Sequence, residues 1–398
     1  MLKKAFLLVL LLSVGISFGQ TKYEKDFDEF WSDIEANYGY LDQQKIDCKK
    51  AKAVYADKIR EVKTREEFVR LLENMLSEFH NGHVSLNTNL SSSNRIVPTG
   101  SDIWIEKSGV DFIIKDLRKG SSAEKSGLKI GMKVAKFNDL EVAPQVQHFL
   151  PKAETSIDSD ATQYAISMLF AGTHDKPRKI SVLENGSVKD YFPDSFKRDE
   201  TISLLESKLV KPNVGYIKIN NSLGNNALIA AFDSALDELA YTKFLILDLT
   251  ETPGGGNTTV ARAIMGRFTT DKKPYQQHEF DEKEFDTKRS WIEYVTPRKS
   301  RYQGKVYILV SHWTGSMGEG LAIGFDAMKA AEIIGTQMAG LIGAISNFRL
   351  SETNIGYQIP TERLYHVNGT PREDFKPKIL TSDTDATWRE VRKRTKID

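Results

Sequence analysis

The sequence predicts an α/β protein built from three successive regions, and three observations support this prediction. Apolar residues with helical spacing occupy residues 23–79, short alternating segments follow between residues 102 and 134, and strands alternate with helices from residue 213. Apolar residues make up 40% of the 398 residues and charged residues 27%, which is typical of a globular protein with room for two or three domains.

Charge and cysteine content exclude several classes of protein. The formal net charge is +1, which argues against nucleic-acid binding through bulk charge and against a disordered chain. Cys48 is the single cysteine, so a disulfide within the chain and a cysteine-based zinc site are both excluded. A lone cysteine in a helical pattern is more often a bystander than a catalytic thiol.

Residues 1–19 are typical of a secretory signal peptide. Two lysines precede an apolar run from Ala5 to Ile16, and Ser17 and Gly19 are small residues at the positions that a signal peptidase reads. The run is about 12 residues long, whereas a membrane span needs about 20. An uncleaved anchor is the alternative. We expect an exported protein, periplasmic or extracellular, without stable membrane insertion once the signal is removed.

Residues 20–91 are predicted to form a helical region that ends in a histidine-bearing turn and a strand. The first helix has one apolar face, formed by Phe27, Phe30, Trp31, Ile34 and Tyr38. A second helix starts near Asp47, and a third is marked by the capping box of Thr64 and Glu67. The turn Phe79–His83 then leads into a short strand over Val84–Leu86.

Residues 92–192 read as a small domain of short strands. The polar stretch Leu90–Asn94 is a plausible boundary, and strands are clearest over 102–105 and 110–114. A short helix after Gly120 ends at Gly127, and Gly131 is placed for a tight turn before another strand.

Residues 200–398 have the alternation of an α/β core. Strands are predicted over 214–219, 244–249, 306–310 and 333–335, and helices over 227–239, from about Thr259 and from about Met317.

Ser316 lies between a buried strand and a helix, in the small-residue turn Thr314–Gly320. A serine at a helix N-terminus lies beside backbone N–H groups and the positive end of the helix, both of which stabilise an oxyanion. This position suits a nucleophile. Serine is also a favoured N-cap, so a purely structural role is the alternative.

The turn Pro253–Gly256 and two histidines complete the set of candidates. Consecutive glycines let backbone N–H groups approach a ligand, so phosphate binding, an oxyanion hole and a tight turn without function all remain open. No Lys-Ser/Thr of a P-loop follows this turn. His80 and His83 flank Asn81-Gly82, and they are either a metal pair, for which no third ligand is indicated nearby, or turn residues.

The order of these motifs resembles the tail-specific, or carboxy-terminal processing, serine protease family over about residues 27 to 380. Leu247–Gly255 is similar to that family's "LDLRxNPGG", Ser316–Glu319 to its "SAxE", and Ile334–Gly340 to its "xGxxTxG". Residues 120–134 resemble a string found in the PDZ domains of bacterial proteases. The resemblance implies a crotonase-like ββα spiral catalytic core over 200–398, a PDZ-like β domain over 92–192, and no metal or organic cofactor.

Within that family, the chain is more similar to the tricorn-like Ser/His branch than to the Ser/Lys branch. Leu341 stands where the dyad lysine is usual, and His83 in Asn-Gly-His-Val fits the branch's "Asp-Gly-His-Thr". The branch also uses a carboxylate near the chain end, for which Glu373 and Asp374 are both candidates. That carboxylate is expected to orient the histidine or to act on its charge, either directly or through another polar group.

The resemblance thus implies a serine endopeptidase of the tail-specific type, acting on polypeptides, with Ser316 as nucleophile and His83 as base. The developing oxyanion would be bound by backbone N–H groups, those of Met317 and of Gly254 or Gly255. Glu319, one helical turn after the nucleophile, either steadies that turn or only caps the helix. The PDZ-like domain would recruit or gate a polypeptide end. The oligomeric state cannot be read from the sequence.

Two alternatives come from other classes. A non-catalytic peptide- or ligand-binding protein on the same fold remains possible because Thr250 and Met317 depart from the family's strings. A crotonase-type acyl-transfer enzyme shares the core, but the predicted export signal argues against it because coenzyme A thioesters are cytoplasmic.

Overall fold

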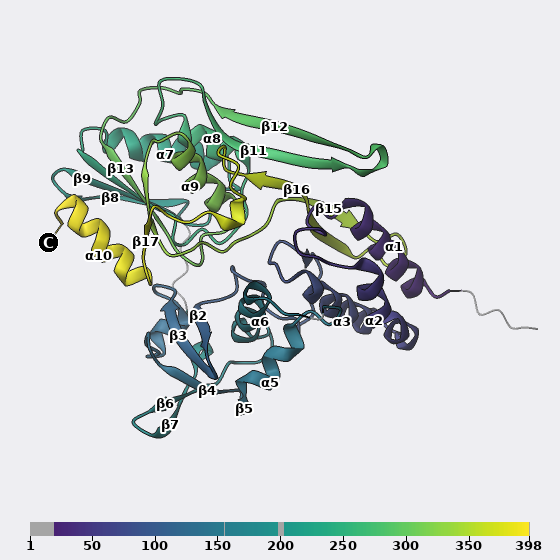
Figure 1. Ribbon diagram of the computed structural model, residues 1–398. Coiled ribbons are helices and arrows are strands. Elements are labelled where there is room, and N and C mark those ends of the chain that lie inside the picture. Colours follow the sequence, from purple (N-terminus) through teal and green to yellow (C-terminus); the bar gives the residue numbers. More distant parts are fainter. Residues whose placement is uncertain (1–19, 155, 198–202, 398) are drawn as a thin grey trace, which may run out of the picture.

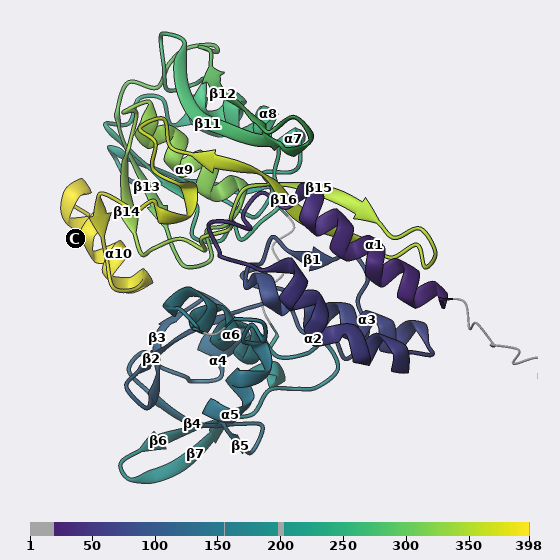
Figure 2. The ribbon, with the colours of Figure 1, turned by 45° about the vertical axis from the view of Figure 1, so that its right-hand side comes forward.

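The computed structural model describes residues 20–154, 156–197 and 203–397, which form a mixed α/β protein (Figure 1). The predicted signal peptide at residues 1–19 lies outside the described residues. Within the described ranges, no helix is both long and apolar enough to cross a membrane. Figure 2 shows three parts: helices at the N-terminal side, a small β region below them, and a larger core.

The N-terminal helices are α1 (Lys22–Asn37), α2 (Cys48–Glu61) and α3 (Arg65–Leu76). The predicted start of α2 near Asp47 and the predicted capping box of α3 are confirmed: Asp47 accepts hydrogen bonds at the start of α2, and Thr64 forms the capping box with Glu67. One buried cluster joins the three helices. The single turn η1 (Ser77–Phe79) then leads to the histidine-bearing turn and to β1 (Ser85–Leu86).

The second region is a twisted antiparallel sheet in the order β2-β3-β4-β6-β7, with β5 beside β4. The predicted strands and short helix are confirmed, and Gly127 and Gly131 both have positive φ, as their turns require. The sequence did not predict the long helix or the last hairpin. The elements are β2 (Ile103–Ser108), β3 (Asp111–Leu117), α4 (Ser122–Lys125), β4 (Lys133–Phe137), β5 (Leu140–Glu141), α5 (Val142–Val146), η2 (Gln147–Phe149), α6 (Ser159–Ala171), β6 (Ile180–Glu184), β7 (Ser187–Tyr191) and η3 (Pro193–Ser195).

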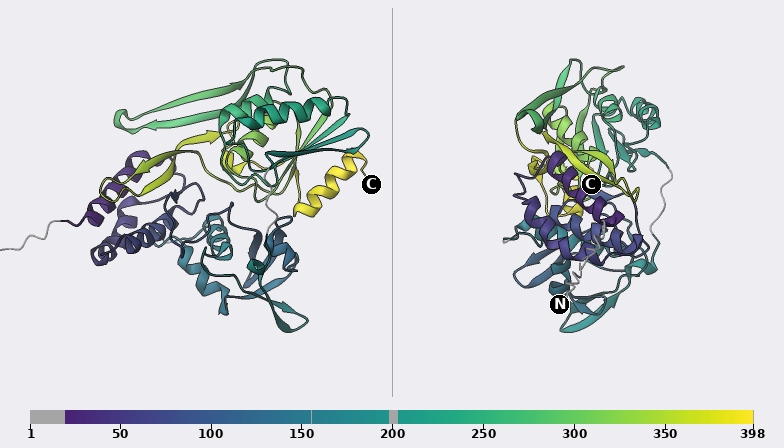
Figure 3. Two further views of the ribbon diagram at one scale, coloured as in Figure 1. Left: turned by 180° about the vertical axis from the view of Figure 1, so that it is seen from behind. Right: turned by 90° about the vertical axis from the view of Figure 1, so that its right-hand side faces the viewer.

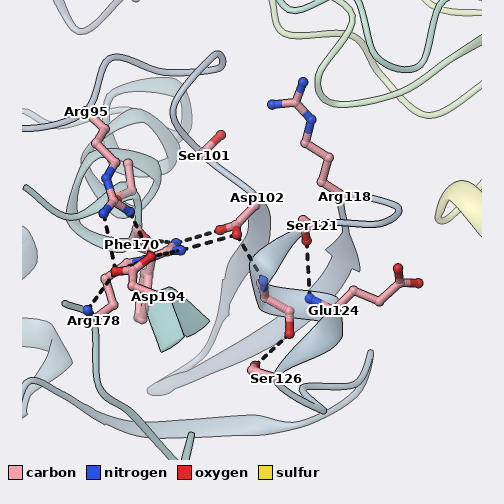
Figure 4. Close-up of polar contacts among 12 residues, drawn as sticks. Arg95, Ser101, Asp102, Arg118, Ser121, Glu124, Ser126, Phe170, Arg178 and Asp194 are labelled. Carbon is pink, nitrogen blue, oxygen red and sulfur yellow. Dashed lines mark hydrogen bonds and ion pairs between the residues drawn. The ribbon is translucent and has the colours of Figure 1, made fainter. Parts of the chain in front are cut away.

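A buried arginine closes this second region. Figure 4 shows Arg178 between Asp102, at the start of the region, and Asp194, near its end. Arg178 is 2% exposed and its guanidinium is 2.5 Å from the first carboxylate and 2.8 Å from the second. The region also has its own apolar cluster.

The core contains a six-stranded sheet in the order β17-β14-β13-β10-β9-β8, parallel except for β8. The predicted strands and helices of the core are confirmed, whereas β8 and the C-terminal helix were not predicted. Their bounds are β8 (Leu205–Lys211), β9 (Val214–Ile219), α7 (Ala227–Glu238), β10 (Phe244–Asp248), α8 (Thr258–Met265), β13 (Lys305–Val310), α9 (Met317–Ala327), β14 (Glu332–Gly335), β17 (Ile379–Leu380) and α10 (Thr384–Thr395).

Helices cover both faces of this parallel sheet, so its strands are buried on both sides. Leu245 and Leu247 of β10 join the cluster formed with α7, α8 and α9, whereas Ile246 joins the cluster of the opposite face with Val391 of α10. The view from behind in Figure 3 shows α10 standing apart from the other core helices.

A third sheet, which the sequence did not predict, connects the core with the N-terminal helices. Its order is β1-β16-β11-β12, with β15 also paired to β16. The core supplies β11 (Lys273–Glu282), η4 (Lys283–Phe285), β12 (Thr287–Val295), β15 (Ala344–Arg349), β16 (Gly356–Tyr365) and the nearby turn η5 (Arg372–Asp374). Because Ser85 of β1 pairs with Gln358 of β16, the turn before β1 is fixed against the core.

Candidate active site

Ser316 lies at the carboxyl edge of the parallel sheet, where the turn after β13 enters α9. Two hydrogen bonds tie this turn to the end of the neighbouring strand β10: Thr314 Oγ1 donates to Leu249 O (2.9 Å) and Ser311 Oγ donates to Thr250 O (2.8 Å). Ser316 itself has φ +53°, in the left-handed region that side-chain-bearing residues seldom adopt. The half-buried serine is therefore held in a strained turn at a helix N-terminus.

His83 contacts Ser316, although 233 residues separate them in the chain. The distance from His83 Nε2 to Ser316 Oγ is 3.0 Å, and Nδ1 lies 2.6 Å from the carbonyl oxygen of Ile342. A carbonyl only accepts hydrogen bonds, so Nδ1 carries the proton of the neutral ring. Nε2 is then the acceptor for the serine hydroxyl, which is the arrangement that a general base needs.

The surroundings of His83 keep its ring neutral. The side chain is 5% exposed, and burial, followed by the positive charge of Arg372, lowers its pKa to about 3. Hydrogen bonds with the backbone at Ile342 and Gly343 act in the opposite direction and are outweighed. At neutral pH the imidazole is therefore free to accept a proton.

The structure does not bring Glu373 or Asp374 to this ring. Asp374 is solvent exposed, and Glu373 is half-buried with its pKa raised by burial. In the described part of the chain, the ring of His83 is hydrogen-bonded to Ser316 and to a backbone carbonyl instead. The expectation of a direct carboxylate partner is therefore corrected, because η5 turns the neighbouring Arg372 toward the site rather than either acid.

Arg372 is the residue that sequence reasoning missed. It is 3% exposed, its Nε donates to Leu341 O (3.1 Å), and its Nη2 donates to Gly343 O (3.1 Å) and also to Leu341 O. No local motif marks this arginine, because its partners are backbone carbonyls about 30 residues earlier in the chain.

The glycine turn after β10 packs against the nucleophile turn. An added Cβ at Gly256 would lie 2.4 Å from Met317 Cβ, so the two turns touch. The N–H of Gly254 donates to Asn221 Oδ1 (3.1 Å), a contact that the sequence did not indicate. In the residues that the structure describes, the N–H groups of Gly255 and Met317 have no acceptor.

Glu319 connects the nucleophile turn with the loop after β14. The carboxylate is 1% exposed and accepts three backbone hydrogen bonds, from Ser316 (2.8 Å), Gly340 (2.9 Å) and Leu341 (3.2 Å). Burial raises its pKa to about 7, although Arg372 and the three donors act to lower it. Glu319 thus does more than cap α9.

The second region contacts the turns on both sides of the site. Trp104 of β2 stacks on His312 with ring centroids 4.0 Å apart, four residues before the nucleophile. Arg118 points away from the Arg178 cluster in Figure 4, and its Nε is 2.7 Å from Glu251, three residues before Gly254. Both ion-pair partners are buried.

The sequence left His80 and His83 open as a possible metal pair. Within the described ranges, no group of three histidine, cysteine or acidic side chains is placed to hold a metal ion. His80 Nε2 lies 3.3 Å from Gln44 Nε2, away from the His83–Ser316 contact.

Two family models match the chain. Residues 213–380 match the model of peptidase family S41, and residues 20–77 match the C1 domain of tricorn protease.

Solved structures of proteases share the fold at low sequence identity. Mature CPAF complexed with lactacystin is 12% identical, with a TM-score of 0.66 over 94% of this chain and 98% of that one. The photosystem II D1 C-terminal processing protease is 17% identical, with a TM-score of 0.57 over 93% and 97%. A putative peptidase from Parabacteroides merdae is 13% identical, with a TM-score of 0.58 over 94% and 96%.

Proposed function

The chain belongs to the S41 family of tail-specific serine peptidases, and from this premise we propose that it is an exported serine endopeptidase with Ser316 as its nucleophile. The observation that supports this function is the 3.0 Å contact between Ser316 Oγ and His83 Nε2 in a ring whose other nitrogen is held by a carbonyl. The predicted signal at residues 1–19 supports export.

In the proposed reaction, Ser316 Oγ attacks the carbonyl carbon of a peptide bond. His83 Nε2 takes the hydroxyl proton as the C–O bond forms, and it returns this proton to the leaving amine as the peptide C–N bond breaks. A water molecule then hydrolyses the acyl-enzyme with the same histidine as base. The neutral state of the ring suits the first step.

The oxyanion is assigned to the N–H groups of Gly255 and Met317. These two donors have no acceptor in the described residues, and they come from the two turns that touch at Gly256. Gly254 is less suited, because its N–H already donates to Asn221. A donor of this kind typically contributes about a hundredfold or more in rate.

The same proposal assigns a role to two regions of the chain. We assign residues 200–398 to a crotonase-like catalytic core and residues 92–192 to a PDZ-like domain that recruits a polypeptide end. β2 forms one edge of the sheet of this region, which suits the addition of an extended peptide. The contacts of Trp104 and Arg118 with the catalytic turns would connect such binding with the site.

A fluorophosphonate probe tests the nucleophile directly. We expect the purified mature protein to be labelled and to hydrolyse an unfolded model protein, and Ser316→Ala to abolish both. His83→Ala should lower the labelling rate by about a hundredfold or more, because the base is lost. Ser346→Ala is the matched control, since Ser346 pairs with Thr361 on β15 and β16 and should label like the wild type.

The outcomes separate the proposed functions. Labelling that survives Ser316→Ala would show that another residue is the nucleophile. A wild-type protein that is folded yet neither labels nor hydrolyses would favour the non-catalytic binding protein.

A further inference from the structure

Among the residues that the structure describes, no carboxylate is hydrogen-bonded to the ring of His83, so another group must fix the orientation of this ring. In a serine triad, the acid holds the imidazole in one tautomer and one orientation. Here the carbonyl of Ile342 occupies that position, at 2.6 Å from His83 Nδ1. A carbonyl can do this only if its own peptide is held in place, and the loop after β14 has no strand partner at residues 340–342.

The carbonyls on either side of Ile342 point to one side chain. Arg372 donates to Leu341 O and to Gly343 O, while the carbonyl between them points to His83. The planar guanidinium presents several donors in a fixed fork, which suits two carbonyls at once. Because the carbonyls of Leu341 and Gly343 are both held, the peptide group between Ile342 and Gly343, which carries the Ile342 carbonyl, cannot rotate freely.

The N–H groups of the same loop are held by two other side chains. Glu319 accepts from Gly340 and Leu341, and Asn81 Oδ1 accepts from the N–H of Ile342 (3.4 Å) and also from the N–H of His83 (3.0 Å). Asn81 Nδ2 also donates to Gly340 O (3.0 Å). Because Glu319 binds the N–H of Ser316 as well, nucleophile, loop and base are connected in one closed set of hydrogen bonds.

We propose that Arg372 is a positioning residue of the active site, which replaces the acid of the triad by aiming the Ile342 carbonyl at His83. This assignment rests on the proposed peptidase function for its catalytic consequence, although the positioning itself does not depend on it. Arg372 acts through the backbone, so it does not touch the substrate.

The charge of Arg372 gives the assignment a distinctive signature. Its positive charge disfavours the imidazolium form of His83 and adds to the effect of burial on the pKa. Glu319, from α9, holds the other side of the same loop, while Glu373 and Asp374 follow Arg372 on η5. An uncharged replacement should therefore loosen the ring and make it easier to protonate.

The test compares Arg372→Met with Arg372→Lys. We expect Arg372→Met to lower kcat and the fluorophosphonate labelling rate tenfold or more with little change in KM, and to move the acid limb of kcat/KM to higher pH. Arg372→Lys keeps the charge but not the fork, so kcat should fall while the acid limb stays in place. Arg267→Met is the matched control, because Arg267 is equally buried in a cluster with Asp233 and should alter stability but not the acid limb.

Nitrogen NMR of the His83 ring provides a readout that needs no catalysis. The wild-type ring should show a single Nδ1–H tautomer, and Arg372→Met should give a mixture of tautomers. A wild-type protein without peptidase activity would refute the proposed function, yet the NMR comparison would still decide whether Arg372 positions the ring. An unchanged tautomer and unchanged kcat in Arg372→Met would overturn the proposal. If that variant does not fold, an unchanged ring signal and kcat in Arg372→Lys would overturn it.

Discussion

At the scale of single residues, a backbone carbonyl stands beside His83 at the place where a serine triad has a carboxylate. An acid at Nδ1 would stabilise the imidazolium that forms during the reaction. The Ile342 carbonyl offers a partial charge instead, and the buried Arg372 adds a positive one. The arrangement thus favours a neutral, correctly oriented ring at rest over a stabilised cation, and this choice determines how the enzyme should respond to pH.

Gly82, next to His83, has no room for a larger side chain. A Cβ at this position would lie 2.1 Å from the carbonyl oxygen of Val97 and 3.0 Å from Leu341 Cδ2. We predict that Gly82→Ala destabilises the protein by about 1–3 kcal/mol through overpacking. Because His83 is the next residue, the labelling rate should also fall. Urea denaturation and probe labelling measure the two effects.

Gly224→Ala is the control for that prediction. A Cβ at Gly224 would lie 3.6 Å from its nearest neighbour, which is ordinary contact, so both stability and labelling should stay close to wild type. Equal effects of the two substitutions would show that the glycine at position 82 is not required for steric reasons.

At the scale of elements, pairing between distant strands assembles the site. β1 has only two residues and could not persist alone, but its pairing with β16 places the preceding turn beside α9. The tilted ring contact between Phe30 in α1 and Tyr357 in β16 reinforces this pairing, and Figure 1 shows β15 and β16 reaching from the core to α1. The N-terminal helices therefore support the base rather than forming a separate unit.

The second region depends in the same way on one buried charge cluster. Arg178 joins Asp102 and Asp194, and although burial opposes it, this contact and that of Arg95 lower the pKa of Asp194 to about 2. We predict that Arg178→Met lowers the free energy of unfolding by about 3–5 kcal/mol, because two carboxylates lose their buried partner. Equilibrium denaturation of the full chain measures this loss.

Lys179→Met tests whether burial is the cause. Lys179 forms ion pairs with Asp139 and Asp190 at the surface of the same region, where such pairs contribute roughly 0–1 kcal/mol. A loss in Lys179→Met as large as that in Arg178→Met would contradict the explanation.

At the scale of the whole molecule, the second region meets the core at the C-terminal helix. Asp116 of β3 accepts hydrogen bonds from the backbone N–H (3.0 Å) and hydroxyl (2.8 Å) of Thr384 at the start of α10. Burial raises the pKa of Asp116 to about 7, against the effect of these donors. The junction therefore contains a carboxyl group that is protonated more readily in the folded protein than in the unfolded chain.

The raised pKa of Asp116 predicts how the stability of the protein depends on pH. The folded protein holds the proton of Asp116 more tightly than the unfolded chain, where the pKa of aspartate is about 3.9. Its contribution to stability is thus present at acidic pH and is lost as pH rises from about 4 to about 7. In Asp116→Asn this part of the slope should disappear, which urea midpoints measured across that range would show.

Asp190→Asn is the control, because the pKa of Asp190 is shifted in the opposite direction to that of Asp116. Hydrogen bonds with Ser181 and then Lys179 lower the pKa of Asp190, so its contribution is lost as pH falls, below the range that concerns Asp116. If Asp116→Asn kept the full slope between pH 4 and 7, another group would have to account for it.

The sequence by itself determined most helices and strands of the protein and the chemical groups of the site, because both depend on residues close together in the chain. Helix caps such as Thr64, the apolar strands, and the small-residue turn around Ser316 depend on neighbours within a few residues, and the structure has them where the sequence predicts them. The resemblance to a peptidase family rests on the same local strings. The third sheet was not predicted, because its hairpins alternate polar and apolar residues too weakly to be recognised.

Only the tertiary structure decided how these groups meet. The order of the motifs along the sequence identified both Ser316 and His83, but the contact between these two residues depends on the pairing of β1 with β16. Glu373 and Asp374 were the acids predicted to act on His83, whereas the direct partner of its Nδ1 is a backbone carbonyl in a loop that Arg372 holds. Strand register and burial over hundreds of residues fix such contacts, because no side chain can select a distant carbonyl until the backbone carrying it has been placed.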